Sequence, residues 1–97
     1  MQRLAVTAPL REGTREEAER LIADGPPFEP GELGFDRHFV FLSSLEAIFV
    51  FEGEDVHLLV DALANDPARS AAFAAWGPVL AGTPRLAHEA YAWERDG

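Results

Sequence analysis

Apolar side chains are concentrated in one stretch near the middle of the chain, residues 35–53. Two runs rich in β-branched and aromatic residues, 38–42 and 47–51, flank a pair of serines, and this composition favours two strands joined by a turn. Because successive side chains of a strand point to opposite faces, Phe39 and Val40 lie on different faces. Both faces of the predicted hairpin are therefore apolar, whereas a sheet with one face in water shows polar residues at alternate positions.

Exposure of a whole apolar face would be costly, because each fully buried Phe or Val side chain gains roughly 1.5–3 kcal/mol relative to exposure. The hairpin therefore predicts that both of its faces are covered, by other parts of this chain or by a second copy of it.

The segments before the hairpin predict a strand, a helix and a loop. Residues 4–8 are an apolar run, which indicates a strand buried on both sides. Thr14 and Glu17 fit a capping box at the start of an amphipathic helix, and Gly25 ends it. The segment 25–34 is rich in proline and glycine, and we expect either a functional lid or a connector there. The side chains expected to hold it against the body are Phe28 and Leu33.

The segments after the hairpin predict a helix, a shorter helical segment and a last strand. Apolar residues at helical spacing over 56–63 give the first helix a buried stripe. Asp66 and Pro67 start the next segment, which Gly77 and Pro78 should kink or end near Trp76. Residues 85–93 alternate as the last strand.

On that last strand, one face carries Leu86 and His88, and the other carries Glu89, Tyr91 and Trp93. We expect a helix over the first of these faces, so that the aromatic residues look toward the side that lacks a cover. A slip of one residue in this strand would exchange His88 for Glu89 at the interior.

The order strand, helix, strand, strand, helix, strand predicts an α+β fold, the ferredoxin-like βαββαβ sandwich. Its four-stranded antiparallel sheet has the order 4-1-3-2, with the helices on one face. The length of 97 residues is that of a single domain, residues 1–97.

Charge and composition exclude several classes of function. The net charge is −9, and all eight basic residues are arginines, so nucleic acid and anionic membranes are not expected as partners. The chain has no cysteine, which excludes a disulfide framework, a thiol nucleophile and cysteine-ligated zinc. No His and carboxylate pair has a recognised metal-ligand spacing, and no cofactor motif occurs, so we expect neither metal nor cofactor.

The location expected from the sequence is cytoplasmic. The first 13 residues lack the apolar core of a signal peptide, and no stretch approaches the ~20 apolar residues that cross a bilayer.

The element order, the two-faced strands and the Pro67-led, alanine-rich segment 66–73 resemble the dimeric α/β-barrel superfamily, which includes the antibiotic-biosynthesis monooxygenases and the stress-responsive A/B-barrel proteins. In that superfamily two ferredoxin-like sheets face each other and close a barrel. The resemblance thus implies a homodimer formed through the sheet faces, in agreement with the need to cover the hairpin. It carries over no catalytic residues, because the Asn, Trp and His arrangements of its enzymes are not reproduced here.

Three residues are candidates for acid–base chemistry: His38, His88 and Glu89. His38 and His88 lie on opposite edge strands, which can approach each other at the mouth of a barrel made by two chains. Glu89 shares a face with aromatic residues, and burial against them would raise its pKa. The alternative is that these are unrelated polar positions on strands.

Aromatic residues supply the candidate walls of a ligand pocket, since such rings commonly line small-molecule sites. The ligand-binding candidates are Trp76, Tyr91, Trp93, Phe39 and Phe49. The same residue types also fill small cores and dimer interfaces.

Two functions agree with these patterns. In the first, a small homodimeric protein binds an apolar or aromatic ligand between its sheet and its partner, without catalysis. In the second, a cofactor-independent monooxygenase or isomerase acts on an aromatic, polyketide-like substrate.

Overall fold

The elements of the fold follow the predicted order. The computed structural model describes residues 2–25, 29–67 and 73–95. The elements, in chain order, are β1 (Gln2–Pro9), α1 (Arg15–Ala23), β2 (Arg37–Leu42), β3 (Glu46–Gly53), α2 (Val56–Asn65), the 3-10 helix η1 (Phe73–Val79) and β4 (Arg85–His88). The strands form one antiparallel sheet in the order β2-β3-β1-β4. This is the predicted order 4-1-3-2, and the ferredoxin-like α+β fold is confirmed.

The hairpin that dominates the sequence forms β2 and β3. Their turn is fixed by Ser43, whose hydroxyl accepts hydrogen bonds from the backbone N–H groups of Leu45 and Glu46 at 3.1 and 3.0 Å. The register places Phe39 opposite Val50 and Val40 opposite Phe49. Residues paired in an antiparallel sheet share a face, so Phe39 and Phe49 point to opposite sides.

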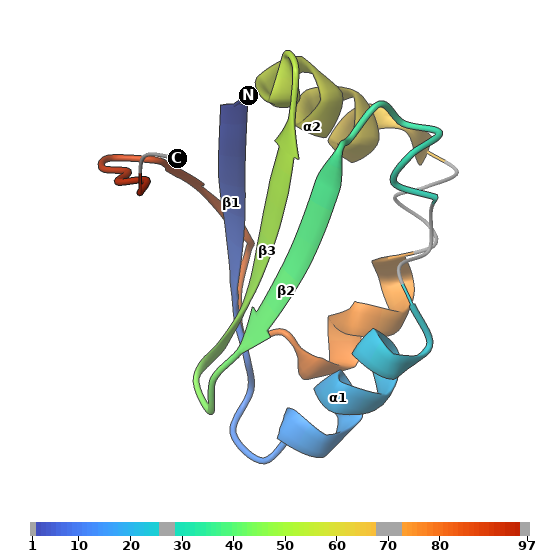
Figure 1. Ribbon diagram of the computed structural model, residues 1–97. Coiled ribbons are helices and arrows are strands. Elements are labelled where there is room, and N and C mark those ends of the chain that lie inside the picture. The colour runs from blue at the N-terminus through green and yellow to red at the C-terminus, as the bar shows by residue number, and fades with distance from the viewer. Residues whose placement is uncertain (1, 26–28, 68–72, 96–97) are drawn as a thin grey trace.

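The helices lie over one face of the sheet, which we call the inner face. Figure 1 shows α2 near one end of the sheet and α1 with η1 near the other. The inner face carries Leu4, Val6, His38, Val40 and Phe49, as the registers of the three strand pairs require.

The other face, the outer face, has no helix of the described chain over it. Its centre is apolar, with Phe39, Phe41, Ile48 and Val50 on the hairpin and Ala5 on β1. Phe41 remains 59% exposed. The hairpin is therefore apolar on both faces, as expected, and the described helices cover only one of them.

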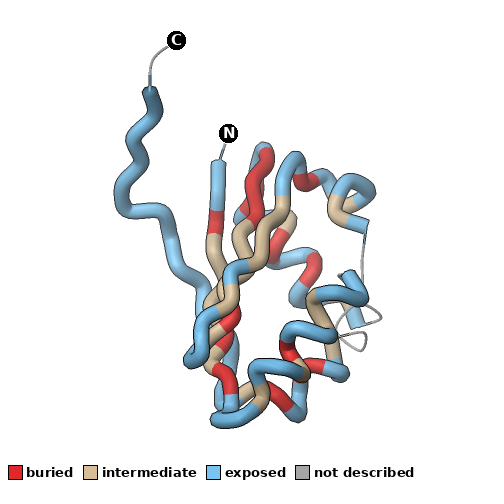
Figure 2. The backbone as a smooth tube through the Cα atoms, turned by 60° about the horizontal axis from the view of Figure 1, so that its bottom comes forward, coloured by how far each residue is buried: buried red, intermediate tan, exposed pale blue. Residues whose placement is uncertain are grey.

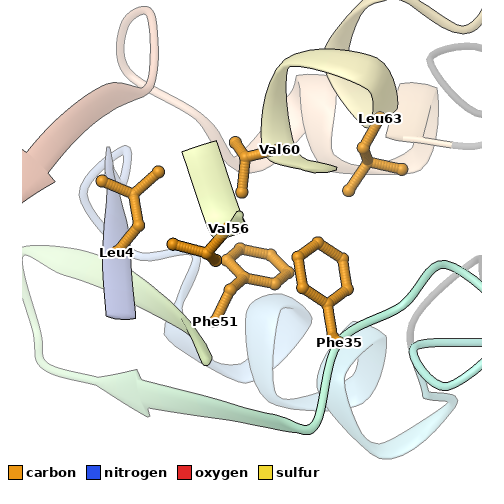
Figure 3. Close-up of a cluster of buried hydrophobic side chains, with 6 residues drawn as sticks. All are labelled: Leu4, Phe35, Phe51, Val56, Val60 and Leu63. Carbon is orange, nitrogen blue, oxygen red and sulfur yellow. The ribbon is translucent and has the colours of Figure 1, made fainter. Parts of the chain in front are cut away.

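The buried core divides into two clusters. The first lies between the sheet and α2. It consists of Leu4, Phe35, Phe51, Val56, Val60 and Leu63 (Figure 3). The second joins the sheet to α1 and η1 and consists of Leu10, Ala18, Ala47, Trp76 and Val79. Phe49 and Phe73 are partly buried and pack against both clusters, so the middle of the inner face is less completely filled than its ends.

The capping box predicted at the start of α1 is wrong. Thr14 occupies the N-cap position but makes no side-chain hydrogen bond to the helix. Its hydroxyl donates to the carbonyl of Arg11 at 2.6 Å instead, because the preceding turn brings that carbonyl within reach.

The last strand is shorter than predicted: β4 ends at His88 rather than at residue 93. His88 pairs with Leu4, so a continued register would place Ala90 opposite Gln2, where β1 begins. The pairing stops two residues short of that point, and the side chain of Glu89 forms an ion pair with Arg3 instead. Figure 2 shows this C-terminal segment, residues 89–95, leaving the body exposed along its length.

Two other expectations fall partly or wholly on residues that are not described. Phe28 and the segment 68–72 lie outside the described residues. The part that follows, η1, is a 3-10 helix that runs through Gly77 and Pro78 to Val79. Of the two predicted outcomes, a kink or an end near Trp76, the end is wrong. The amide of Leu80 closes this helix on the carbonyl of Trp76 at 3.2 Å.

Candidate functional site

A cavity of about 290 Å³ lies between the inner face of the sheet and the helices. The strands contribute Val6, Ala8, His38, Val40, Phe49 and Phe51, and the helices contribute Leu21, Ile22, Val60, Leu63, Ala64, Phe73 and Trp76. Phe51, Val60 and Leu63 belong to one buried cluster and Trp76 to the other. The cavity therefore lies between the two clusters.

His38 is the only ionisable side chain among the described residues that line this cavity. It lies on β2, half-buried, with its ring 4.5 Å from that of Phe51 and 20° from parallel to it. Its Nδ1 is 3.0 Å from the carbonyl oxygen of Val50. Because a carbonyl can only accept, Nδ1 carries the proton, and in the neutral ring Nε2 carries the lone pair.

Burial lowers the pKa of His38 from its ordinary value of 6.5, although the hydrogen bond to the carbonyl of Val50 opposes this shift. The charged form is disfavoured because the ring loses water on entering an apolar surrounding. His38 is therefore held as a neutral imidazole of defined tautomer near pH 7.

Trp76 and Phe49 form an aromatic wall of the same cavity. Their ring centres are 5.3 Å apart and their planes lie at 77°, the edge-to-face arrangement that aromatic pairs favour. Trp76 is 8% exposed. The predicted ligand-binding residues Phe49 and Trp76 and the predicted acid–base residue His38 thus line the same cavity.

A second hollow of about 490 Å³ opens beside the first. It is lined by Glu29, Pro30, Gly31, Phe35, Asp36, Arg37 and His38. His38 lines both spaces, so it lies where the apolar cavity adjoins a polar depression of the surface. Gly25 lines the cavity and Glu29 the depression, so the described parts of the predicted loop border both.

Phe39 does not line the cavity. It lies on the outer face, with the guanidinium of Arg37 4.9 Å from its ring centre. The sequence placed Phe39 and Phe49 in one set because both are aromatic residues of the hairpin, and the register separates them.

Glu89, Tyr91 and Trp93 lie on the exposed segment that follows β4, away from the lining of the cavity. Glu89 pairs with Arg3 at 2.7 Å. Tyr91 is 80% exposed and Trp93 68% exposed. In the single chain these residues are therefore available for contacts with another molecule.

His88 meets a different histidine from the one expected. It contacts His57 of α2, with 3.1 Å between its Nδ1 and the Nε2 of His57. His38 lies on β2, at the opposite edge of the sheet. Within one chain the structure does not bring His38 and His88 together.

Several cavity residues were not identified from the sequence, namely Leu21, Ile22, Val40, Val60, Leu63 and Phe73. Their apolar pattern indicated core positions, and nothing in it distinguishes a packed core from one with a hollow. The strand register supplies the missing information. Val40 pairs with Phe49, so both lie on the inner face, and His38, two residues before Val40, lies on that face as well.

Two further properties concern the described residues only. No group of three or more His, Asp or Glu side chains among them is arranged to hold a metal ion. None of their helices is long and apolar enough to cross a membrane.

No family model and no curated protein sequence matches this chain. Solved structures share its fold. Tetracenomycin F2 cyclase from Streptomyces glaucescens, a type-II polyketide cyclase, superposes with a TM-score of 0.74 at 16% identity, over 99% of this chain and 100% of the other.

Two further structures are similar over most of their length. A protein from Caulobacter crescentus assigned as an antibiotic biosynthesis monooxygenase gives a TM-score of 0.60 at 18% identity, over 94% of this chain and 89% of the other. A protein of unknown function from Nitrosomonas europaea gives 0.60 at 18% identity, over 98% and 94%. The chain thus shares the fold of these structures.

Proposed function

We propose that this chain binds a flat, largely apolar aromatic molecule in the cavity between sheet and helices, and that His38 removes a proton from it. One observation carries the proposal: the only ionisable group among the described lining residues is a histidine held neutral, with its tautomer fixed by Val50. A neutral imidazole of fixed orientation is suited to act as a general base.

The walls of the cavity favour an aromatic ligand. Phe49, Phe51, Phe73 and Trp76 present rings to the space, and apolar pockets with few polar groups are the usual sites for small molecules. The volume of about 290 Å³ is near the lower end of such sites, which range over roughly 300–1,000 Å³. It suits two or three fused rings.

The proposed step is abstraction of a proton from a phenolic hydroxyl or from a carbon next to a carbonyl. The proton moves to Nε2 of His38, while Nδ1 keeps its hydrogen bond to Val50. The substrate becomes a phenolate or an enolate. Burial disfavours the imidazolium, so it returns the proton readily to the product.

Polyketide-like molecules contain such acidic positions. Two structural neighbours are described as a polyketide cyclase and an antibiotic biosynthesis monooxygenase, and these descriptions support a polyketide-like aromatic as the class of substrate. Cyclisation and oxygenation of such molecules can both begin with loss of a proton.

A protein that binds the same ligand without chemistry is the second candidate. Among the described lining residues, the indole N–H of Trp76 is the only side-chain hydrogen-bond donor besides His38. An enolate is normally stabilised by several donors, and this scarcity favours binding alone.

The proposal includes a homodimer formed through the outer faces. Phe39, Phe41, Ile48 and Val50 form an apolar surface on that side, and burying such a surface favours association. Tyr91 on the exposed C-terminal segment adds a side chain suited to an interface. A cytoplasmic location, expected from the sequence, belongs to the same proposal.

The bicyclic ketone 2-tetralone tests the proposal because it offers both an apolar ring system and acidic protons beside a carbonyl. We expect it to bind with a change in tryptophan fluorescence and to exchange those protons for deuterium in D₂O faster with the protein than without it. The variant His38→Gln should keep binding and lose at least tenfold of the protein-dependent exchange rate, measured by NMR.

Binding without accelerated exchange would leave the protein as a binding protein only. Absence of saturable binding of 2-tetralone and of related naphthols would contradict the cavity as a ligand site.

A further inference from the structure

Two histidines lie close together away from the cavity, between α2 and β4. The imidazoles of His57 and His88 face each other with 3.1 Å between Nε2 and Nδ1. Their planes differ by 11°, and the ring centres, at 5.2 Å, are farther apart than the nitrogens. Both side chains are exposed.

The fold places these two residues together. His88 pairs with Leu4, so its side chain lies on the inner face at the edge of the sheet. Val56 and Val60 of α2 point into the core above Leu4. His57, next to Val56, lies on the flank of the helix that is turned toward β4, and the two rings meet beside the core rather than within it.

The separation of the two nitrogens suits a chelated metal ion. A tetrahedral zinc ion with bonds of about 2.0–2.1 Å to nitrogen holds two ligands about 3.3 Å apart, close to the observed 3.1 Å. The two nitrogens now point at each other, and a turn of both exposed rings would direct their lone pairs toward one point beside the line that joins them. The net charge of −9 raises the local concentration of cations.

We propose that His57 and His88 form a two-imidazole site for a borderline divalent transition-metal ion, Zn²⁺, Ni²⁺ or Cu²⁺, whose other positions are filled by water. Neutral imidazole suits these metals. In the free pair one facing nitrogen donates to the other. On binding, that proton moves to the far nitrogen of its own ring, so that both facing lone pairs ligate and no proton is lost from the neutral pair.

The ion would connect α2 to the end of β4. No residue of β4 belongs to either buried cluster of the described chain, so this strand is held mainly by its pairing with β1. Metal binding would therefore strengthen the attachment of β4, immediately before the exposed segment with Tyr91 and Trp93.

The test is calorimetric titration of ZnCl₂ into the whole chain near pH 7.5, with His57→Gln, His88→Gln and the double variant. We expect one ion per chain. Each single replacement should weaken binding at least tenfold, and the double replacement should add little, because a chelate is lost with its first ligand. The melting temperature of the unaltered chain should rise with ZnCl₂, and that of the variants should not.

Asp61→Asn is the matched control. Asp61 is exposed on α2 one turn after His57, so its replacement removes a nearby charge and leaves both imidazoles. We expect its affinity for zinc to stay within about threefold of that of the unaltered chain. Equal melting temperatures in EDTA would verify that all variants are folded.

Independent, additive losses in the two single variants would show that each imidazole binds an ion separately and would overturn the proposal. The proposal would also be overturned if the unaltered chain bound zinc no more tightly than the variant His57→Gln.

Discussion

At the scale of the residue, His38 decides what the cavity can do. Its ring lies against Phe51, its Nδ1 is committed to the carbonyl of Val50, and its pKa is lowered by burial. A histidine exposed on a strand would be partly protonated near its ordinary pKa of 6.5. The fold therefore turns an ordinary titrating side chain into a neutral one that can accept a proton.

The lowered pKa of His38 predicts a dependence of stability on pH. Between the folded-state pKa and 6.5, the unfolded chain binds more protons at this residue than the folded chain, so the free energy of unfolding falls as the pH falls through that window. The variant His38→Gln lacks this contribution. We expect the difference in the free energy of unfolding, unaltered chain minus variant, to be smaller at about pH 5 than at about pH 7.5, by urea denaturation.

A difference that is constant across this range would contradict the burial of a neutral His38. A difference that grows on acidification would indicate that the folded state raises the pKa of the ring.

At the scale of the element, the alternation of the hairpin has two different consequences. One face of β2 and β3 lines the cavity, with Val40 and Phe49, and the other forms the uncovered surface, with Phe39 and Val50. The sequence predicts this two-faced character correctly, because alternation depends only on the strand geometry. It does not predict which aromatic residues share a face, because that depends on the register between strands.

The ends of the elements were the least predictable from the sequence. Residues 89–93 have the alternation of a strand, yet β4 ends at His88, before its pairing reaches the first residues of β1. The alternation of side chains therefore does not determine where the pairing between strands stops. For the same reason the sequence grouped Tyr91 and Trp93 with Trp76 in a single pocket, whereas only Trp76 lines the cavity.

A pair of matched substitutions distinguishes the two faces. Val40→Phe adds a ring on the cavity side, and Val50→Phe adds the same ring on the outer face. We expect Val40→Phe to weaken binding of 2-tetralone at least tenfold, because the new ring occupies the cavity, and Val50→Phe to change it less than threefold. Overpacking of a core costs roughly 1–3 kcal/mol, and a melting curve of each variant checks the fold.

The reverse order of effects, with binding lost in Val50→Phe and kept in Val40→Phe, would place the ligand on the outer face between two copies.

At the scale of the whole molecule, we propose that the two faces of one sheet have different roles. The inner face, with its helices, encloses the cavity within one chain, and the outer face remains available for a second copy. The proposed ligand site and the proposed dimer interface therefore lie on opposite faces. The sequence led us to expect a ligand between the sheet and a partner chain, since it indicated an uncovered face and gave no sign of a hollow beneath the helices.

The proposed dimer predicts a particular response to charge. Phe41 is exposed on the outer face, and Leu58 is exposed on α2. We expect Phe41→Asp to reduce the mass in solution from about twice 10.6 kDa to 10.6 kDa, because a carboxylate on an apolar interface must be desolvated. Leu58→Asp, an equal change elsewhere on the surface, should leave the dimer intact. Light scattering at micromolar concentration measures both.

A mass of one chain for the unaltered protein would remove the dimer from the proposal, and equal effects of the two substitutions would place the interface elsewhere.

The central claim is that the ligand enters the space between sheet and helices of a single chain. Methyl NMR during titration with 2-tetralone tests it most directly. We predict that the methyl resonances of Val6, Val40 and Val60, which line the cavity, shift and saturate at one ligand per chain, while those of Ile48 and Val50 on the outer face stay in place. Shifts confined to Ile48 and Val50 would contradict the claim.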